Sequence, residues 1–172
     1  MHGAIHDYFA ADHERLDGLA RRAVADPAGL DREAFDEFRG GLLRHIGMEE
    51  RFLFPAVRRA IAGGPAVDLR RFRVEHAAIT SLLVGAPDAA LLLEIRSILT
   101  PHDDAEDGPG GLYDVCDDLL GSDADSVLAR VRAYPTPRLR PYQDHPRVLR
   151  TARDALRMAT SGTRPGPGDG GA

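Results

Sequence analysis

The chain has 172 residues, of which 43% are hydrophobic and 28% are charged, a composition typical of one soluble domain with its own core. Its only cysteine, Cys116, excludes an internal disulfide, a cysteine zinc site and dithiol redox chemistry, so any metal must be held by histidine and carboxylate side chains. The apolar runs are too short to cross a bilayer and the first residues lack a signal-peptide pattern, which predicts a cytoplasmic protein.

Charge divides the chain into two parts. All 22 basic residues are arginines, and residues 1–133 contain 15 of them against 24 acidic residues, a net charge of −9. This acidic domain disfavours nucleic-acid binding, because phosphate contacts need a basic face. Residues 134–172 contain 7 arginines against 3 aspartates, and we expect this basic, Pro- and Gly-rich tail to pack on the acidic domain or to contact a protein partner.

Apolar residues in the first 106 positions recur at steps of three and four, which predicts helices rather than strands. Proline- and glycine-containing breaks divide this region into four helical stretches, and they lie at 26–31, 62–65, 85–88 and 108–111. Such short connections favour antiparallel neighbours, so we predict an all-α, up-down-up-down four-helix bundle. Shorter helices are expected at about 112–120 and 123–133. In the tail, a capped helix is predicted from Asp144, and the last residues, 162–172, are expected to be disordered.

Each of the four long helices has one histidine on its apolar stripe. These histidines are His13, His45, His76 and His102. Glu49 and Glu106 follow two of them at the fourth position, and side chains four residues apart lie about 5 to 6 Å from each other on one helical face. A buried carboxylate without a partner strongly destabilises a fold, so these buried side chains need a partner that they can share. We expect them to bind metal.

The spacing of these residues also predicts that they lie in one layer. In an antiparallel hairpin, two residues at the same height are equidistant from the turn. The midpoint of His13 and His45 is residue 29, inside the first break. The midpoint of Glu49 and His76 falls inside 62–65. Six imidazole and carboxylate ligands are more than one zinc ion needs, and carboxylates that bridge suit a pair of iron ions better than manganese.

The sequence lacks the Glu-x-x-His motif of ferritin-type bundles and the HExxH motif of zinc proteases. It resembles the hemerythrin-like (HHE cation-binding) family over residues 5 to about 120. The resemblance rests on Asp12-His13, on His45 followed by Glu49-Glu50, on Glu75-His76, and on Pro101-His102 followed by Glu106. It implies a non-haem di-iron centre, two iron ions with an oxo or hydroxo bridge. The four histidines would be terminal ligands, and Glu49 and Glu106 would be carboxylate bridges.

One position departs from the oxygen-carrying hemerythrins, because Thr80 stands where they have a second histidine on the third helix. We expect Thr80 to point toward the iron held by His76 and to leave it an open position. The set of four histidines and two glutamates is instead similar to the di-iron repair-of-iron-centres proteins and to the iron-sensing domain of a eukaryotic F-box protein.

Several other residues have ordinary structural explanations. His6 is expected to be an exposed residue of the first helical turn, although it could line an entrance to the site. His2 and His145 are expected on the surface without ligand partners, and Cys116 is expected to be packed in the core. Aromatic residues are expected to wall the site by core packing, and these are Tyr8, Phe9, Phe38 and Phe52.

Two classes of function are compatible with this site. In the first, a binding or sensing protein takes up O2, NO, peroxide or iron itself, and its order follows metal occupancy. In the second, a redox enzyme reduces O2, peroxide or NO, or delivers iron to damaged iron centres. No residue stands out as a nucleophile or as an anchor for an organic substrate, so binding and sensing is favoured. A metal-free interaction bundle is the remaining alternative.

Overall fold

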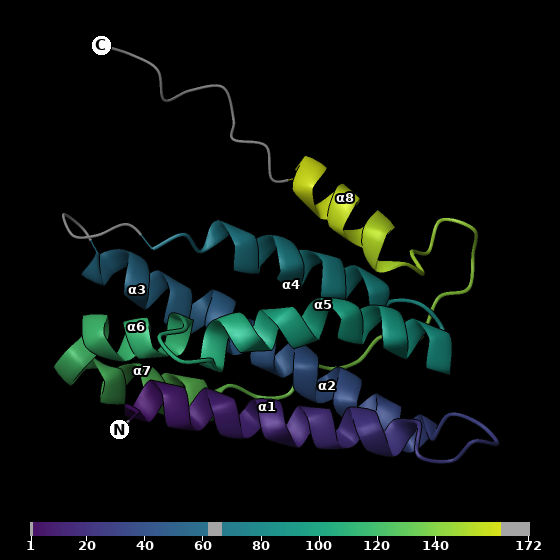
Figure 1. Cartoon of the computed structure of the whole chain (residues 1–172), viewed down its shortest axis with the longest axis horizontal. Helices are drawn as coiled ribbons and strands as arrows, with labels where there is room; N and C mark the ends of the chain where they lie inside the picture. Colours follow the sequence, from purple (N-terminus) through teal and green to yellow (C-terminus); the bar gives the residue numbers. More distant parts are fainter. Residues whose placement is uncertain (1, 62–66, 163–172) are drawn as a thin grey trace, which may run out of the picture.

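Four long helical segments run antiparallel and form a bundle in the computed structural model, which describes residues 2–61 and 67–162 (Figure 1). The segments are α1 (Ala4–Ala23); α2 (Arg32–Met48), continued through the π-helix η1 (Glu49–Leu53) into α3 (Phe54–Ala60); α4 (Arg70–Leu82); and α5 (Ala89–Asp107). No strand occurs in these described residues, and the predicted all-α four-helix bundle is confirmed. The predicted breaks lie between helices, except that 62–65 falls outside the described residues.

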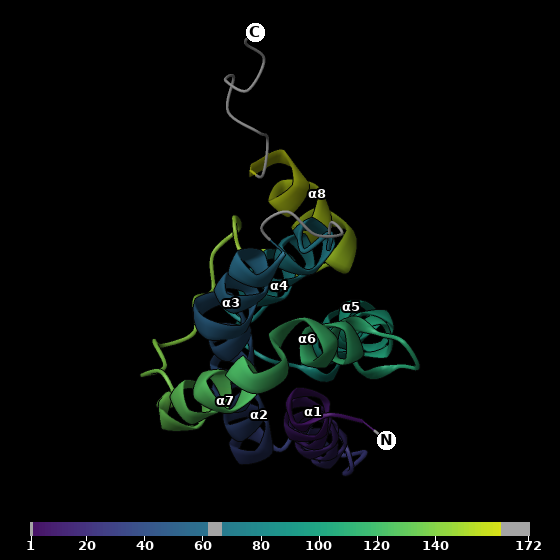
Figure 2. The ribbon, with the colours of Figure 1, turned by 90° about the vertical axis from the view of Figure 1, so that its left-hand side faces the viewer.

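Two short helices close one end of the bundle, as the sequence predicts. They are α6 (Leu112–Leu120) and α7 (Ala124–Ala133), joined by the single 3-10 turn η2 (Gly121–Asp123). The first packs against α1, α3 and α5, and the second packs against η1 and α1. Figure 2 looks at the bundle from this end and shows α6 next to α5.

The apolar core consists of two clusters, one at each end of the bundle. On α1, the cluster next to α6 and α7 ends at Phe9, and the other cluster begins at Leu16. On α4, the same boundary falls between Phe72 and Ala78. A histidine lies in each of these gaps, so the bundle contains a buried polar layer between two apolar clusters.

Aspartate side chains fix where the helices begin. Asp31 accepts a hydrogen bond from the backbone N–H of Ala34 and caps α2, and Asp88 caps α5 in the same way. The cap of α1 comes from α6 instead, because the Asp117 carboxylate accepts from the N–H groups of Ile5 and His6 at 2.9 Å each. This contact holds the first turn of α1 against α6.

The π-helix lies at the height of the buried polar layer and changes the register of the second segment. A wider turn inserts one extra residue, so the buried face moves from the expected Phe52 to Leu53, which is fully buried. Glu49 begins this turn and Glu50 follows it, which points the two carboxylates at different neighbours.

Within residues 134–162, the part that the structure describes, the tail packs on the bundle, but its helix begins later than predicted. Residues near Asp144 form a turn, in which the N–H of Val148 donates to the carbonyl of His145. The helix α8 (Ala152–Gly162) begins after Thr151, whose hydroxyl accepts from the N–H of Asp154 and acts as the cap. This helix contacts α4 and α5 and buries Ala155 completely. Among the described residues, no helix has the length and apolar composition needed to cross a membrane.

Candidate metal centre

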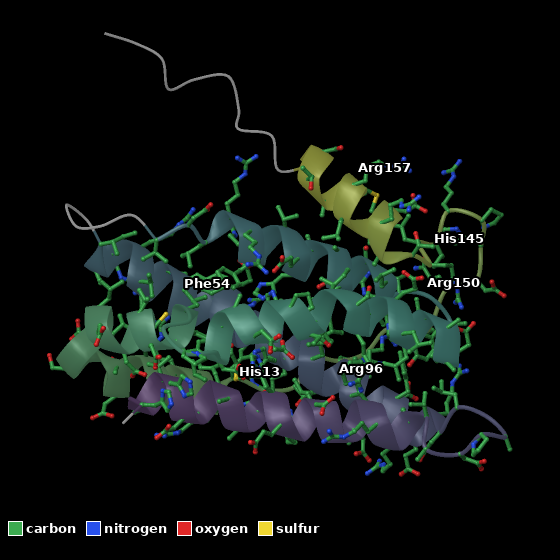
Figure 3. The ribbon with its side chains drawn as sticks, in the orientation of Figure 1. His13, Phe54, Arg96, His145, Arg150 and Arg157 are labelled. Atoms are coloured by element: carbon green, nitrogen blue, oxygen red, sulfur yellow. The ribbon has the colours of Figure 1, made fainter. Side chains whose placement is uncertain are left out.

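The six residues predicted to bind metal come together in the middle of the bundle. They are His13 of α1, His45 of α2, Glu49 of η1, His76 of α4, and His102 and Glu106 of α5. None is more than 7% exposed, and both glutamates are fully buried. Figure 3 shows His13 at the middle of the bundle, between α1 and α5.

The donor atoms form two groups that share Glu106, and within each group all donor atoms lie within 4.8 Å of one another. We call the first group, His13, His45 and Glu106, the open group, because a cavity borders it. We call the second group, Glu49, His76, His102 and Glu106, the closed group. In the open group, Nε2 of His13 lies 3.0 Å from Nε2 of His45. In the closed group, Nε2 of His76 lies 3.1 Å from Oε2 of Glu49. This arrangement suits two cations, with the Glu106 carboxylate within reach of both.

Each of the four histidines turns Nε2 toward the centre and has a carboxylate at Nδ1. The pairs are His13 with Asp107 (2.9 Å), His45 with Asp12 (3.0 Å), His76 with Glu50 (3.0 Å) and His102 with Glu75 (2.8 Å). Donation through Nδ1 leaves the Nε2 lone pair directed at the centre, which is the tautomer that a metal ligand needs. The carboxylates therefore orient the rings for metal binding.

These four carboxylates form a closed ring around the bundle. Each is adjacent in sequence to one proposed ligand but pairs with the histidine of a neighbouring helix: Asp12 precedes His13, for example, and contacts His45. Successive residues on a helix are about 100° apart, so when one side chain faces the bundle axis, its neighbour faces an adjacent helix. The position of each carboxylate next to a predicted ligand could have indicated this orienting role from the sequence.

Three buried nitrogen and oxygen atoms in the centre have no hydrogen-bond partner. They are Oε2 of Glu49, Nε2 of His76 and Oε1 of Glu106. Glu49 and His76 are close, but they are not aligned as a hydrogen bond. Unsatisfied buried donors and acceptors are rare in proteins, because each loses its contacts with water. A cation between these atoms would satisfy all three, so the residues present fit a metal.

Neighbouring charges raise the pKa of three histidines of the centre and hold protons on them. Burial lowers the pKa of His13, but hydrogen bonds with Asp107 and Glu106 outweigh it and raise the pKa to about 11. Burial is likewise outweighed at His76 and His102, where glutamate contacts raise the pKa to about 9 and about 10. Without metal, these protons neutralise the buried glutamates, and a bound cation would replace them.

Tyr113 of α6 reaches the point between the two groups, a role that the sequence analysis missed. Its hydroxyl donates to Oε1 of Glu49 at 2.7 Å and lies 3.0 Å from Oε2 of Glu106. The same oxygen is 3.3 Å from Nε2 of both His13 and His45. Burial and the two glutamate charges raise its pKa well above the ordinary range, so the phenol stays protonated. No spacing rule connects a residue beyond the 108–111 break to this point.

Aromatic rings wall the closed group. The ring of Phe54 stacks on His76, with centroids 5.6 Å apart, and Phe72 meets the edge of His102 at 5.6 Å. Phe9 contacts His45, as expected for a wall residue. Phe52 instead packs against Tyr134 outside the centre, because the π-helix rotates it away. Tyr8 packs on Phe9 and Met48, and Cys116 is buried in the apolar cluster as expected.

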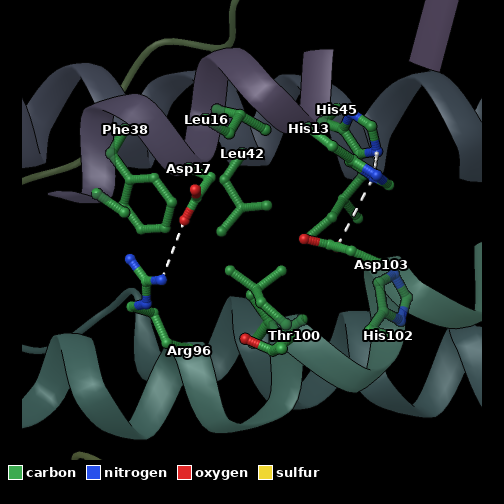
Figure 4. A pocket seen from close by; sticks show the side chains of 14 residues that line it. His13, Leu16, Asp17, Phe38, Leu42, His45, Arg96, Thr100, His102 and Asp103 are labelled. Atoms are coloured by element: carbon green, nitrogen blue, oxygen red, sulfur yellow. Dashed lines mark hydrogen bonds and ion pairs between the residues drawn. The ribbon is translucent and has the colours of Figure 1, made fainter. Parts of the chain in front are cut away.

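A small cavity of about 40 Å³ borders the open group (Figure 4). His13, His45 and His102 form one end, and apolar side chains such as Phe38 and Leu42 line its length. At the other end, Arg96 and Asp17 form an ion pair at 3.0 Å. Half-buried Asp103 also lines it, with Oδ1 3.7 Å from Nε2 of His13. Burial raises the pKa of Asp103 to about 6, despite the charge of His13.

Two further expectations about individual residues are wrong. Thr80 is exposed on α4 and does not face the centre, because the inner stripe continues from His76 to Ile79 at the third position rather than the fourth. Thr80 therefore does not point toward a metal held by His76. His6 is also not an exposed residue of the first turn, since only 7% of it is accessible and it packs under His2.

A helical bundle that directs buried imidazole and carboxylate donors from four segments to one centre defines a class of metal-binding bundle proteins. Residues 4–109 match the family described as hemerythrin HHE cation binding domain. The match covers more than half of the chain, and the protein belongs to this family. No curated protein and no solved structure gives a match.

Proposed function

We propose that this protein holds a non-haem di-iron centre that binds O2, NO or peroxide. The observation that carries the proposal is the pair of donor groups sharing the buried carboxylate of Glu106. Imidazole and carboxylate donors without sulfur suit iron, and carboxylates that span two positions suit a pair of ions. In this proposal the four histidines are terminal ligands, and Glu49 and Glu106 are the bridges.

The difference between the two groups indicates where a small ligand binds. The closed group offers four donors and is walled by Phe54 and Phe72, whereas the open group offers three donors and borders the cavity. A cavity needs roughly 10 to 15 Å³ of this kind of volume to hold one water molecule, so the volume of about 40 Å³ has room for a diatomic molecule or peroxide.

The surrounding residues have separate tasks in this proposal. Bound iron would supply electrons and a Lewis acid to the small ligand. The carboxylates at Nδ1 hold the imidazole rings in position, and Phe38 and Leu42 keep the approach apolar. The hydroxyl of Tyr113 holds a proton beside both glutamates.

Anaerobic reconstitution of the full chain with Fe(II), followed by metal counting, tests this proposal. We expect two irons per chain and a change in the optical spectrum when NO or azide is added. The His145→Ala variant is the control, since His145 is exposed and far from the centre, and it should take up the same amount of iron. One zinc per chain with no iron uptake would contradict the di-iron assignment.

A redox enzyme that reduces O2, peroxide or NO is the second candidate, and Asp103 favours it. Reduction of these molecules consumes protons, and the half-buried Asp103 carboxyl lies beside the cavity, 3.7 Å from Nε2 of His13, where it can pass a proton to a bound ligand. The Asp103→Asn variant separates the two functions. An enzyme should lose turnover in this variant while keeping its two irons, whereas a binding protein should show stoichiometric uptake with or without Asp103.

A further inference from the structure

We propose a second metal site, separate from the di-iron centre, formed by His2, His6 and Asp114 where α1 begins beside α6. One ligand atom from each of these residues lies within 4.8 Å of the other two. Two imidazoles and one carboxylate are the ligand types that bind Zn²⁺ with three protein ligands and an exchangeable fourth position. The site would therefore take a divalent cation of this class.

The fold positions these residues through contacts between α1 and α6. The Asp117 carboxylate accepts from the N–H groups of Ile5 and His6, which fixes the first turn of α1 next to Asp114. Oδ2 of Asp114 accepts from the N–H of Gly110 at 3.0 Å, so this carboxylate is held in place. Its other oxygen, Oδ1, lies 2.9 Å from Nδ1 of His2.

His6 supplies a second observation that points to a ligand. Its Nε2 donates to the backbone carbonyl of Asp107 at 2.9 Å, which leaves the lone pair on Nδ1. Nδ1 is buried and has no hydrogen-bond partner, since Oδ1 of Asp7 is 3.9 Å away. A buried acceptor of this kind needs a partner, and a cation bound together with His2 and Asp114 would provide one.

Metal binding requires one movement, which the structure permits. The rings of His2 and His6 stack at 3.8 Å with an angle of 12°, so their lone pairs lie in two nearly parallel planes and do not meet at one point. His2 must turn its ring to share a cation with His6. It precedes α1 and its side chain is 51% exposed, so this rotation meets little resistance.

The site lies close to the di-iron centre but shares no ligand with it. The two sites are connected through Asp107, whose carbonyl accepts from His6 and whose carboxylate accepts from His13. Because the second site shares no ligand with the di-iron centre, its loss should leave the iron content unchanged.

Titration of the iron-loaded full chain with Zn²⁺, followed by isothermal calorimetry and metal counting, tests the proposal. We expect the wild-type chain to take up one more equivalent of Zn²⁺ than the His2→Ala and Asp114→Asn variants, with equal iron in all three. The imidazole nitrogen resonances of His6 should shift when Zn²⁺ is added to the wild type. The His145→Ala variant removes an exposed histidine outside the cluster and should keep the extra equivalent.

Two results would overturn this inference. One is a wild-type chain that takes up no zinc in addition to its iron. The other is an additional zinc that persists in both variants, which would be an adventitious ion only. Iron content is counted separately in each sample, so neither result depends on whether the central site holds two irons.

Discussion

The closed and open groups share a carboxylate, a helix and a common height in the bundle, yet they differ in their surroundings. The closed group has four donors and two aromatic walls. The open group has three donors and a neighbouring cavity. A nearly symmetric bundle can thus hold one ion firmly and offer the other to a ligand. The asymmetry arises from what the helices place around the donors.

Loss of the shared carboxylate should have the largest effect on this comparison. Glu106→Ala removes a donor from both groups and leaves His102 without its main charge partner. We expect the open group, left with two donors, to lose its iron, and the closed group, left with three donors, to bind its iron more weakly. Metal at about 100 times its Kd stabilises a protein by about 2.7 kcal/mol, so the iron-dependent rise in Tm should shrink as well. Asp104→Ala, an exposed position on the same helix, is the control, and two retained irons in Glu106→Ala would disprove the bridge.

Removal of one histidine from each group tests the asymmetry directly. His45→Ala leaves the open group with two donors, and we expect one iron per chain. His102→Ala leaves the closed group with three donors, and we expect two irons at saturating Fe(II), with the second bound more weakly. Metal counting over an Fe(II) titration measures both. Equal iron loss in the two variants would mean that the donor count does not distinguish the groups.

Tyr113→Phe should have a smaller effect, because it keeps the ring and removes only the hydroxyl. Glu49 loses a buried hydrogen bond at 2.7 Å, which costs about 1 to 3 kcal/mol in the metal-free protein. We expect a lower Tm without metal, two irons after reconstitution, and a changed azide spectrum. A spectrum identical to wild type would show that the hydroxyl does not contact the ligand position.

Protons and metal should compete for the same histidines. The pKa values of His13, His76 and His102 are raised from 6.5 to about 11, 9 and 10, so in the metal-free protein their stabilising effect is complete below pH 6.5 and is lost as pH rises through 9 to 11. Metal binding must expel these protons, so affinity should increase with pH. Calorimetry with Zn²⁺ at pH 7 in buffers of different ionisation enthalpy should show proton release, and heats independent of buffer would contradict it.

The sequence predicts that these six side chains meet in one layer, because their spacing is a local property of helices. His45 and Glu49 share one face by the helical repeat, and equal distances from a turn place His13 beside His45. Tyr113 could not be found this way, since it reaches the centre from a helix beyond the bundle. The proposed second metal site also depends on a contact across more than one hundred residues, between His2 and Asp114.

The wrong predictions have identifiable physical causes. For Thr80, a step of four was assumed where the inner stripe of α4 takes a step of three, from His76 to Ile79. For Phe52, the π-helix moved the buried face by one residue, and a regular repeat cannot predict such a turn. For the tail helix, Pro146 suits a first helical turn but equally suits the observed loop, and the cap at Thr151 decides the boundary.

The smallest effect should come from the far end of the cavity, where Arg96 and Asp17 form an ion pair with side chains that are 33% and 38% exposed. Exposed ion pairs contribute only about 0 to 1 kcal/mol, so Arg96→Met should leave Tm and iron content nearly unchanged. Arg21→Met is a matched control, because Arg21 pairs with the same aspartate at 2.7 Å but does not line the cavity. If ligands reach the open group along this cavity, stopped-flow mixing with azide should show a changed association rate in Arg96→Met and a wild-type rate in Arg21→Met. Equal rates in all three proteins would show that azide reaches the open group by another route and that this end of the cavity does not control its binding.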